Sequence, residues 1–263
     1  MTRFLIRQHL LLLTNIKLLK NTKRKRRNKI MKISVFGIPD VKLGKSNVKD
    51  PRLDEVDKFV KAKKRTYVQV DLAGEDALLE ADAILLTKDS RTDLILRDLE
   101  FVETRLSRAT EDQEKQFLNK LKMILEKEEF ISRADLAKDE KDSLTKYSLI
   151  TSRPVIAVEK DELADMNAVL LKVLKEGGYI SFFTAGEKDT RAWLIRNGET
   201  AWEASGAIHS DIQKGFIRAE IIAFDDFVSA GGETAAKQAG KLRLEQKDYI
   251  MKDTDLANFR FNK

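Results

Sequence analysis

The sequence has no cysteine and only two histidines, His9 and His209. The absence of cysteine excludes disulfides and thiolate metal sites, and two histidines are too few for a histidine-rich metal centre. Long hydrophobic runs are missing too, because the apolar stretch from Phe4 to Leu19 is interrupted by polar residues and is too short to span a bilayer. We therefore expect a cytoplasmic protein with no membrane partner.

Residues 1–30 lack acidic side chains but hold ten lysines and arginines. The formal charge of +6 therefore divides into +10 for this segment and −4 for residues 31–263. A basic tail of this kind can bind nucleic acid or an anionic membrane surface. Because MKISVFG from Met31 predicts a strand that runs directly into Gly37, we interpret residues 1–30 as a disordered basic tail or as a start assigned upstream of Met31.

The first motif nearly matches a phosphate-binding loop. In GxxxxGK[ST], successive backbone N–H groups curl round a phosphate, the lysine reaches the outer phosphates and the hydroxyl holds Mg²⁺. Here six residues instead of four separate Gly37 from Gly44, and one of them is Pro39, which has no N–H to donate. We interpret Gly37, Gly44, Lys45 and Ser46 as the remnant of a nucleotide site, with Ser46 as the candidate Mg²⁺ ligand.

The helix that should follow a phosphate loop is missing. The pair Asp50–Pro51 instead starts a different helix, with Asp as N-cap and Pro in the first turn. Further on, Asp71 and Gly74 resemble the DxxG of a switch region, in which Asp reaches Mg²⁺ and the Gly N–H meets the γ-phosphate. Glu75 and Asp76 follow at once, and they add negative charge where a phosphate would sit.

A helical hairpin is predicted from Asp93. Its apolar residues repeat at alternating spacings of four and three, which is typical of a coiled-coil seam, and residues 110–112 break the run into two antiparallel helices. Such a hairpin is more often an arm or a docking surface than a catalytic element. Buried strands are expected at residues 83–86 and 154–158, and a helix closed by glycines is expected at 163–174.

The chain from Tyr179 predicts a different unit. Two strands, a helix, a third strand, an alanine-rich irregular helix and two short strands follow in the order of a β-grasp, ubiquitin-like domain. Their expected ranges are 179–184, 190–195, 199–207, 216–223, 249–251 and 257–261. Within this unit we expect Trp193 and Trp202 in the core, and His209 as a helix-end cap that binds a carbonyl.

The C-terminal residues also resemble a known family. The segment that begins YISFFTAGEKDTRAWLIRNGETAWEASG and ends FRFNK is similar to the TGS domain of the YchF/Obg-like ATPase family over Tyr179–Lys263. DPRLDEV, the helical hairpin and SRPVIAV resemble the same family in the same order. The resemblance implies an ATP-preferring P-loop protein that associates with ribosomes, with a GTPase-like domain, a coiled-coil arm and a TGS domain.

The sequence departs from that family at each nucleotide contact. Two residues are inserted in the phosphate loop, and the glycine-rich switch loop that carries the family's catalytic histidine is missing. The adenine-reading NxxE appears as EKDE, so that Glu159 replaces the asparagine and only Glu162 matches. Losing a positioning group lowers a rate, whereas losing the amide nest removes the ligands of the phosphate and its metal. Hydrolysis is therefore expected to be lost before binding.

These features predict an α/β plus α+β protein. It has a shrunken P-loop NTPase-like parallel sheet, an inserted antiparallel coiled-coil arm and a TGS β-grasp domain. The ranges, after the tail at 1–30, are 31–92 and 151–178 for the sheet, 93–150 for the arm and 179–263 for the TGS domain.

The predicted function is translation-associated binding to the ribosome or to structured RNA through the TGS domain and the arm, with no catalytic residue and no cofactor. The candidate phosphate contacts of the TGS domain are Arg191, Arg196, Lys214 and Arg218. Solvated surface charge is an equal interpretation of these four, since acidic residues are interleaved. An alternative function is a residual P-loop protein that binds Mg-ATP, or GTP, through Lys45 and Ser46. A third is a structural adaptor whose arm pairs with a partner protein. The sequence does not predict the oligomeric state.

Overall fold

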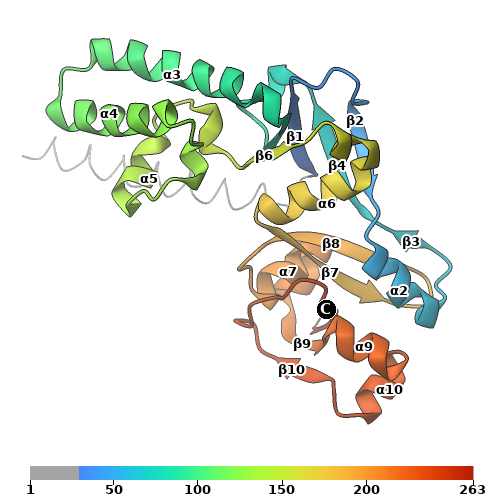
Figure 1. The fold of residues 1–263 in the computed structure, drawn as a ribbon. Coiled ribbons are helices and arrows are strands. Elements are labelled where there is room, and N and C mark those ends of the chain that lie inside the picture. Colours follow the sequence, from blue (N-terminus) through green and yellow to red (C-terminus); the bar gives the residue numbers. More distant parts are fainter. Residues whose placement is uncertain (1–29, 263) are drawn as a thin grey trace, which may run out of the picture.

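The computed structural model describes residues 30–262. The predicted basic tail therefore lies, apart from Ile30, outside the described residues. The described chain forms two sheets and a projecting pair of helices (Figure 1). No helix within residues 30–262 is long and apolar enough to cross a membrane.

The N-terminal sheet has five strands in the order β2-β4-β1-β5-β6. Strands β1, β4, β5 and β6 are parallel, and β2 runs antiparallel to β4 at the edge. The mainly parallel sheet that the sequence predicts is thus present. Its strands are β1 (Met31–Phe36), β2 (Gly44–Val48), β4 (Val68–Ala73), β5 (Ala83–Thr87) and β6 (Val155–Val158).

The two faces of this sheet are covered differently. One face packs against α6 (Met166–Glu176), and the other face of β1 and β5 packs against the base of the helical pair. Strand β4 alternates buried and more exposed residues, with Gln69 exposed and Asp71 half-buried on the second face. The second face of β4 is therefore partly exposed to solvent, unlike the same face of β1 and β5.

The helical pair consists of α3 (Arg91–Arg108) and α4 (Asp112–Glu126), which lie side by side in Figure 1. The predicted break between them is confirmed. A short helix, α5 (Lys138–Leu144), follows at the base. There the buried carboxylate of Asp98 accepts hydrogen bonds from the N–H groups of Ile150 and Thr151 at 2.8 and 2.7 Å, which ties α3 to the segment before β6.

The C-terminal sheet has six strands in the order β10-β9-β11-β7-β8-β3. Its strands are β3 (Arg65–Thr66), β7 (Tyr179–Ala185), β8 (Thr190–Arg196), β9 (Phe216–Ile222), β10 (Arg243–Glu245) and β11 (Leu256–Phe261). Its helices are α7 (Ala201–Ile208), α8 (Ser210–Lys214), α9 (Phe224–Ala230) and α10 (Glu233–Gln238). The strand expected at 249–251 is wrong, because Ile250 forms only an isolated bridge with Thr200 and β10 takes the edge instead.

An early segment of the chain belongs physically to this second sheet. Helix α2 (Pro51–Val60) starts at Asp50, whose side chain accepts the N–H of Arg52, as the Asp-Pro pair predicts. It buries Leu53 and Val56 in a cluster that also contains Phe183 and Phe227. Strand β3 then pairs parallel to β8. Residues 50–66, which the sequence suggested as part of the first domain, therefore pack on the C-terminal sheet.

Candidate functional site

The candidate site is the carboxyl edge of the N-terminal sheet. In open α/β sheets, ligands bind beyond the carboxyl ends of the parallel strands. Strand β1 leads there to Gly37, β4 to Gly74, β5 to Ser90 and β6 to Glu159. Three of the predicted nucleotide contacts, Gly37, Gly74 and Glu162, lie at or near this edge.

The other half of the phosphate motif is not a loop. Gly44, Lys45 and Ser46 form strand β2 and pair antiparallel with Leu72, Asp71 and Val70 in that order. The expectation that these residues belong to a loop after β1 is therefore wrong. Amides in a strand point alternately to opposite sides and bond to a neighbouring strand, so they cannot curl round one phosphate. These residues form a strand because the GKSNV segment continues to Val48, whose side chain is buried, instead of continuing into a helix.

Gly37 is held by the protein's own side chains. Its φ of +66° suits glycine, and a Cβ built there would lie 2.3 Å from Ser90 Oγ. Its N–H donates to Glu75 Oε1 at 3.3 Å, and Arg97 pairs with Glu75 at 2.8 Å. The Arg97 guanidinium also lies over the Phe36 ring, 4.6 Å from its centroid. The Glu75 carboxylate thus accepts the hydrogen bond that the Gly37 N–H would donate to a phosphate.

The end of β4 is occupied in a similar way. A Cβ on Gly74 would lie 3.0 Å from Asp76 Oδ1 and 3.6 Å from Leu43 Cδ1, and the Gly74 carbonyl accepts the Ser34 hydroxyl at 2.8 Å. An apolar and an acidic side chain therefore stand beside the glycine that would meet a γ-phosphate. Asp71 lies further back, in β4, opposite Lys45.

Glu159 and Glu162, at the motif expected to read the base, are both held in ion pairs. Glu162 accepts the Glu159 N–H at 2.8 Å and pairs with Lys172 at 2.8 Å, and the hydrogen bond from Lys172 lowers the pKa of Glu162. Lys88 pairs with Glu159. At these positions the edge is occupied by the protein's own side chains. Sequence reasoning found Glu75 and Asp76 but missed Leu43, Ser90 and Arg97, whose positions depend on tertiary packing.

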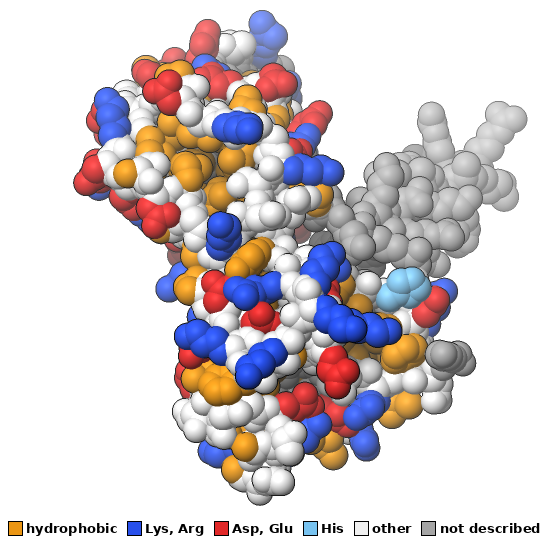
Figure 2. All heavy atoms as spheres, turned by 90° about the vertical axis from the view of Figure 1, so that its right-hand side faces the viewer, with side chains coloured by type: hydrophobic (Ala, Val, Ile, Leu, Met, Phe, Trp, Pro, Cys, Tyr) orange, Lys and Arg blue, Asp and Glu red, His pale blue; other side chains and the backbone are white. Residues whose placement is uncertain are grey.

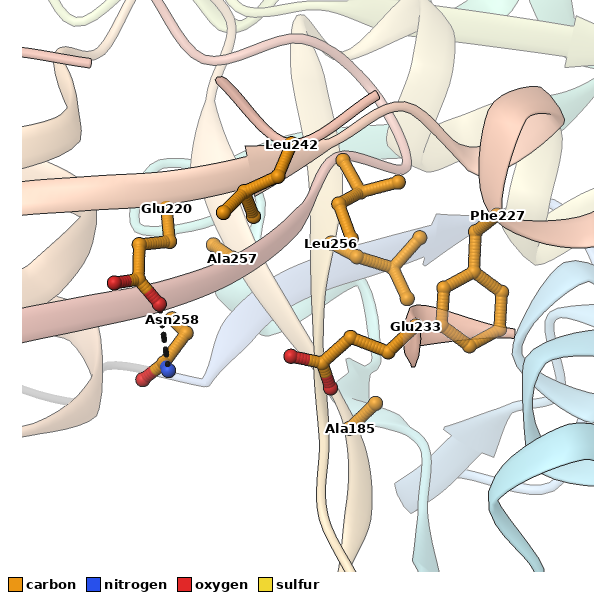
Figure 3. Close-up of a pocket in the computed structure, with 9 residues that line it drawn as sticks. Ala185, Glu220, Phe227, Glu233, Leu242, Leu256, Ala257 and Asn258 are labelled. Carbon is orange, nitrogen blue, oxygen red and sulfur yellow. Dashed lines mark hydrogen bonds between the residues drawn. The ribbon is translucent and has the colours of Figure 1, made fainter. Parts of the chain in front are cut away.

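One hollow of about 560 Å³ lies away from this edge, beside α5, and Lys141, Tyr147 and Arg153 are among the residues that line it. Within residues 30–262, no cluster of three histidine, aspartate or glutamate side chains could hold a metal ion. A small, partly open pocket against the C-terminal sheet is shown in Figure 3, where Asn258 donates to Glu220 and the apolar side chains of Phe227 and Leu256 lie near Glu233. Its volume of about 30 Å³ admits water and no nucleotide.

The four basic residues predicted as phosphate contacts are spread over the C-terminal unit. Arg191 stacks on Trp193 at 4.1 Å, whereas Arg196, of opposite parity in β8, stacks on Tyr179 at 4.1 Å. Lys214 pairs with Asp211 in α8. Arg218 lies in β9, opposite Arg260 of β11. The structure thus does not gather these four on one surface.

Two other predictions for this unit concern His209 and the tryptophans. His209 does cap the end of α7, where its backbone N–H donates to the Ser205 carbonyl at 3.2 Å, and its Nδ1 also accepts the Asp211 N–H at 3.2 Å to start α8. Trp193 is half-buried, and it stacks on Phe182 and donates to Thr184 Oγ1 at 2.9 Å. Trp202 is 44% exposed, so its assignment to the core is wrong.

Comparisons with known proteins agree with this architecture. The family model YchF-GTPase_C, described as a protein of unknown function (DUF933), matches residues 179–262. A "Ribosome-binding ATPase YchF" from Bacillus subtilis is 32% identical over 235 residues, which cover 65% of this chain and 64% of that protein. A protein of the same name from Haemophilus ducreyi is 57% identical over 82 residues, which cover 31% of this chain and 23% of that protein.

A solved structure shares the fold. The structure of the Schizosaccharomyces pombe YchF GTPase superposes with a TM-score of 0.71 at 19% identity, covering 89% of this chain and 99% of that one. This likeness shows a mixed α/β fold with a parallel sheet and helices. The present chain spans just under two thirds of the length of the Bacillus subtilis relative.

Proposed function

Because the chain belongs to the YchF/Obg-like ATPase family, we propose that it is a shortened member that binds ribosomes and has lost nucleotide hydrolysis. Ribosome binding is the property that its Bacillus and Haemophilus relatives carry in their names. In this proposal the C-terminal unit is a TGS β-grasp domain, and α3 with α4 is the family's coiled-coil arm. Both serve for attachment.

One observation carries the proposal. Gly44, Lys45 and Ser46 are paired in an edge strand, while the Gly37 amide is bound by Glu75. A P-loop acts through a cradle of amides that point at one phosphate, supported by the dipole of the helix that follows. Here a strand replaces that helix, and a carboxylate replaces the phosphate.

The proposed loss affects nucleotide binding as well as the rate of hydrolysis. A mispositioned catalytic group lowers turnover by roughly 10²–10⁴-fold, and the enzyme still binds its substrate. Without the cradle and the switch residues, the γ-phosphate and Mg²⁺ have no ligands to hold them. The negative charges of Glu75 and Asp76 at the edge add repulsion against a polyphosphate. Attachment without turnover is therefore the proposed function.

The test uses the full chain in two assays. Titration calorimetry with Mg-ATP and Mg-GTP is expected to give no saturable heat, and sedimentation through a sucrose cushion is expected to carry the protein down with ribosomes. The variant Lys45→Ala should behave as wild type in both assays. Micromolar, Mg²⁺-dependent nucleotide binding that Lys45→Ala abolishes would establish the residual nucleotide-binding P-loop protein instead. Absence of the wild-type protein from the ribosome pellet would refute the attachment role.

A further inference from the structure

The pairing of β3 with β8 brings together two basic segments that are far apart in sequence. Helix α2 ends at Val60, and the chain turns through Lys61, which has a left-handed φ of 52°. The N–H of Lys63 then donates to the Glu187 carbonyl at 3.0 Å, and the carbonyl of Lys64 accepts the Thr190 N–H at 2.9 Å. The 61–64 loop is thus fixed against the turn between β7 and β8.

Four exposed lysines form the surface of this junction, and we call them the lysine knob: Lys61, Lys63, Lys64 and Lys188. Figure 2 shows the side of the molecule on which β3 and α2 lie, and lysine and arginine side chains gather across its middle. This surface differs from the scattered set Arg191, Arg196, Lys214 and Arg218, because two backbone hydrogen bonds fix it as one unit.

The lysine knob is not neutralised. None of its four side chains pairs with a carboxylate of residues 30–262. The acids nearby are engaged elsewhere: Arg65 binds Asp54 and Asp57, and Asp189 accepts the Thr66 hydroxyl at 2.8 Å. Glu187 is the exposed acid within the junction. A lysine near a helix C-terminus stabilises the helix dipole, but that accounts for Lys61 alone, since Lys188 belongs to no helix.

The chemistry of the junction selects its partner. Protein interfaces are anchored by exposed aromatic or large apolar side chains, and neither the 61–64 loop nor the 186–189 turn contains one. Phe59, which precedes the loop, is 40% exposed, and the rest of its ring packs edge-on against Phe227 with centroids 6.0 Å apart. Lysines without an apolar anchor are point charges suited to a phosphate backbone, which they contact without reading sequence.

We infer that the lysine knob is the surface through which this chain holds the phosphate backbone of structured RNA. The inference rests on the proposed ribosome attachment and assigns it a place and a chemistry. It also gives α2 and β3 a role, since these elements carry Lys61, Lys63 and Lys64 to the tip of the β7–β8 hairpin.

The test compares charge changes at and away from the knob. The variant Lys64→Gln/Lys188→Gln removes one cation from each segment, and Lys175→Gln/Lys247→Gln removes two exposed cations outside it. Binding of a fluorescein-labelled RNA hairpin is measured by anisotropy over a salt series, and ribosome pelleting is measured in parallel. The knob variant should lose a salt-dependence slope of about 0.9 per lysine and about tenfold in affinity. The control variant should match wild type.

The outcomes separate this inference from the proposed function. A wild type that pellets with ribosomes while the knob variant keeps its RNA affinity and slope would overturn the inference and leave attachment standing. Weaker pelleting with unchanged hairpin binding would point to an acidic protein partner and would overturn it too. A wild type that binds the hairpin through the knob but fails to pellet would refute ribosome attachment alone. Equal thermal unfolding of both variants excludes misfolding as the cause.

Discussion

The two sheets of the molecule use their charged side chains in opposite ways. At the carboxyl edge of the N-terminal sheet, Glu75 binds Gly37 and Arg97, and Lys88 binds Glu159. At the β3 edge of the C-terminal sheet, the lysine knob projects cations with no carboxylate partner within the described chain. The first pattern satisfies polar groups internally and leaves little for a ligand. The second leaves charge available for one.

Helix α2 joins these two regions into one structure. It lies in sequence between β2 of the first sheet and β3 of the second, and its buried residues share a core cluster with residues of both sheets. Shrinkage of the nucleotide edge has therefore not separated the domains. The retained part of the first domain serves as support for the C-terminal sheet.

The largest expected effect comes from Leu53→Ala. Leu53 is fully buried in α2, so truncation should lower the free energy of unfolding by about 2–4 kcal/mol. Both tryptophans lie in the C-terminal unit, so urea unfolding followed by tryptophan fluorescence reports on that sheet. Leu96→Ala, at a side chain that is 52% exposed, is the control and should change stability by less than about 0.5 kcal/mol. An unchanged fluorescence midpoint for Leu53→Ala would show that α2 is not part of the C-terminal core.

The second largest effect is expected at Gly37, and it tests how tightly side chains pack at the carboxyl edge of the N-terminal sheet. Gly37→Ala places a methyl group against Ser90 and forces a left-handed φ, and we expect a loss of about 1–3 kcal/mol. Gly198→Ala shares the positive φ but has no atom within 4 Å of the new Cβ, so it should lose only about 1 kcal/mol. The double variant Gly37→Ala/Ser90→Ala should recover part of the difference. Equal losses for the two glycines would mean that the edge is more open than Ser90 indicates.

The sequence predicted most elements because their signals are local. Asp50 as N-cap, the break before Asp112 and the strand that ends at Gly37 each depend on neighbouring residues alone, and all three are confirmed. The acids after Gly74 were also recognised from the sequence, and one of them, Glu75, accepts the Gly37 N–H. The identities of residues that are close in sequence were sufficient for these predictions.

The sequence did not predict the features that depend on tertiary packing. GKS is identical in a phosphate loop and in strand β2, and only the pairing of Lys45 with Asp71 distinguishes them. Nor does any local signal place Lys64 beside residues 186–190, because that depends on β3 joining a sheet whose other strands begin more than one hundred residues later. The candidate RNA contacts were selected by charge within one segment, so a surface built from two segments was missed.

The smallest effect concerns a third charged region, on the face of the C-terminal sheet that carries the small pocket. Glu220 in β9 accepts two hydrogen bonds from Arg260, at 2.8 and 2.9 Å, and one from Asn258. The hydrogen bond from Arg260 is the main cause that lowers the pKa of Glu220 below 4.5. A carboxyl group with a lowered pKa in the folded state stabilises the protein above its unfolded pKa, and this contribution is lost as the pH falls through the folded value.

Glu220→Gln should therefore lower the urea midpoint at neutral pH, and the difference from wild type should shrink as the pH falls below 4.5. Because Arg260 is half-exposed, solvent screening keeps this effect below those of Leu53→Ala and Gly37→Ala. Arg260→Gln should lose the same pH dependence, and the double variant should add little to either single change. A difference that stays constant across the acid range would show that Glu220 acts through packing alone.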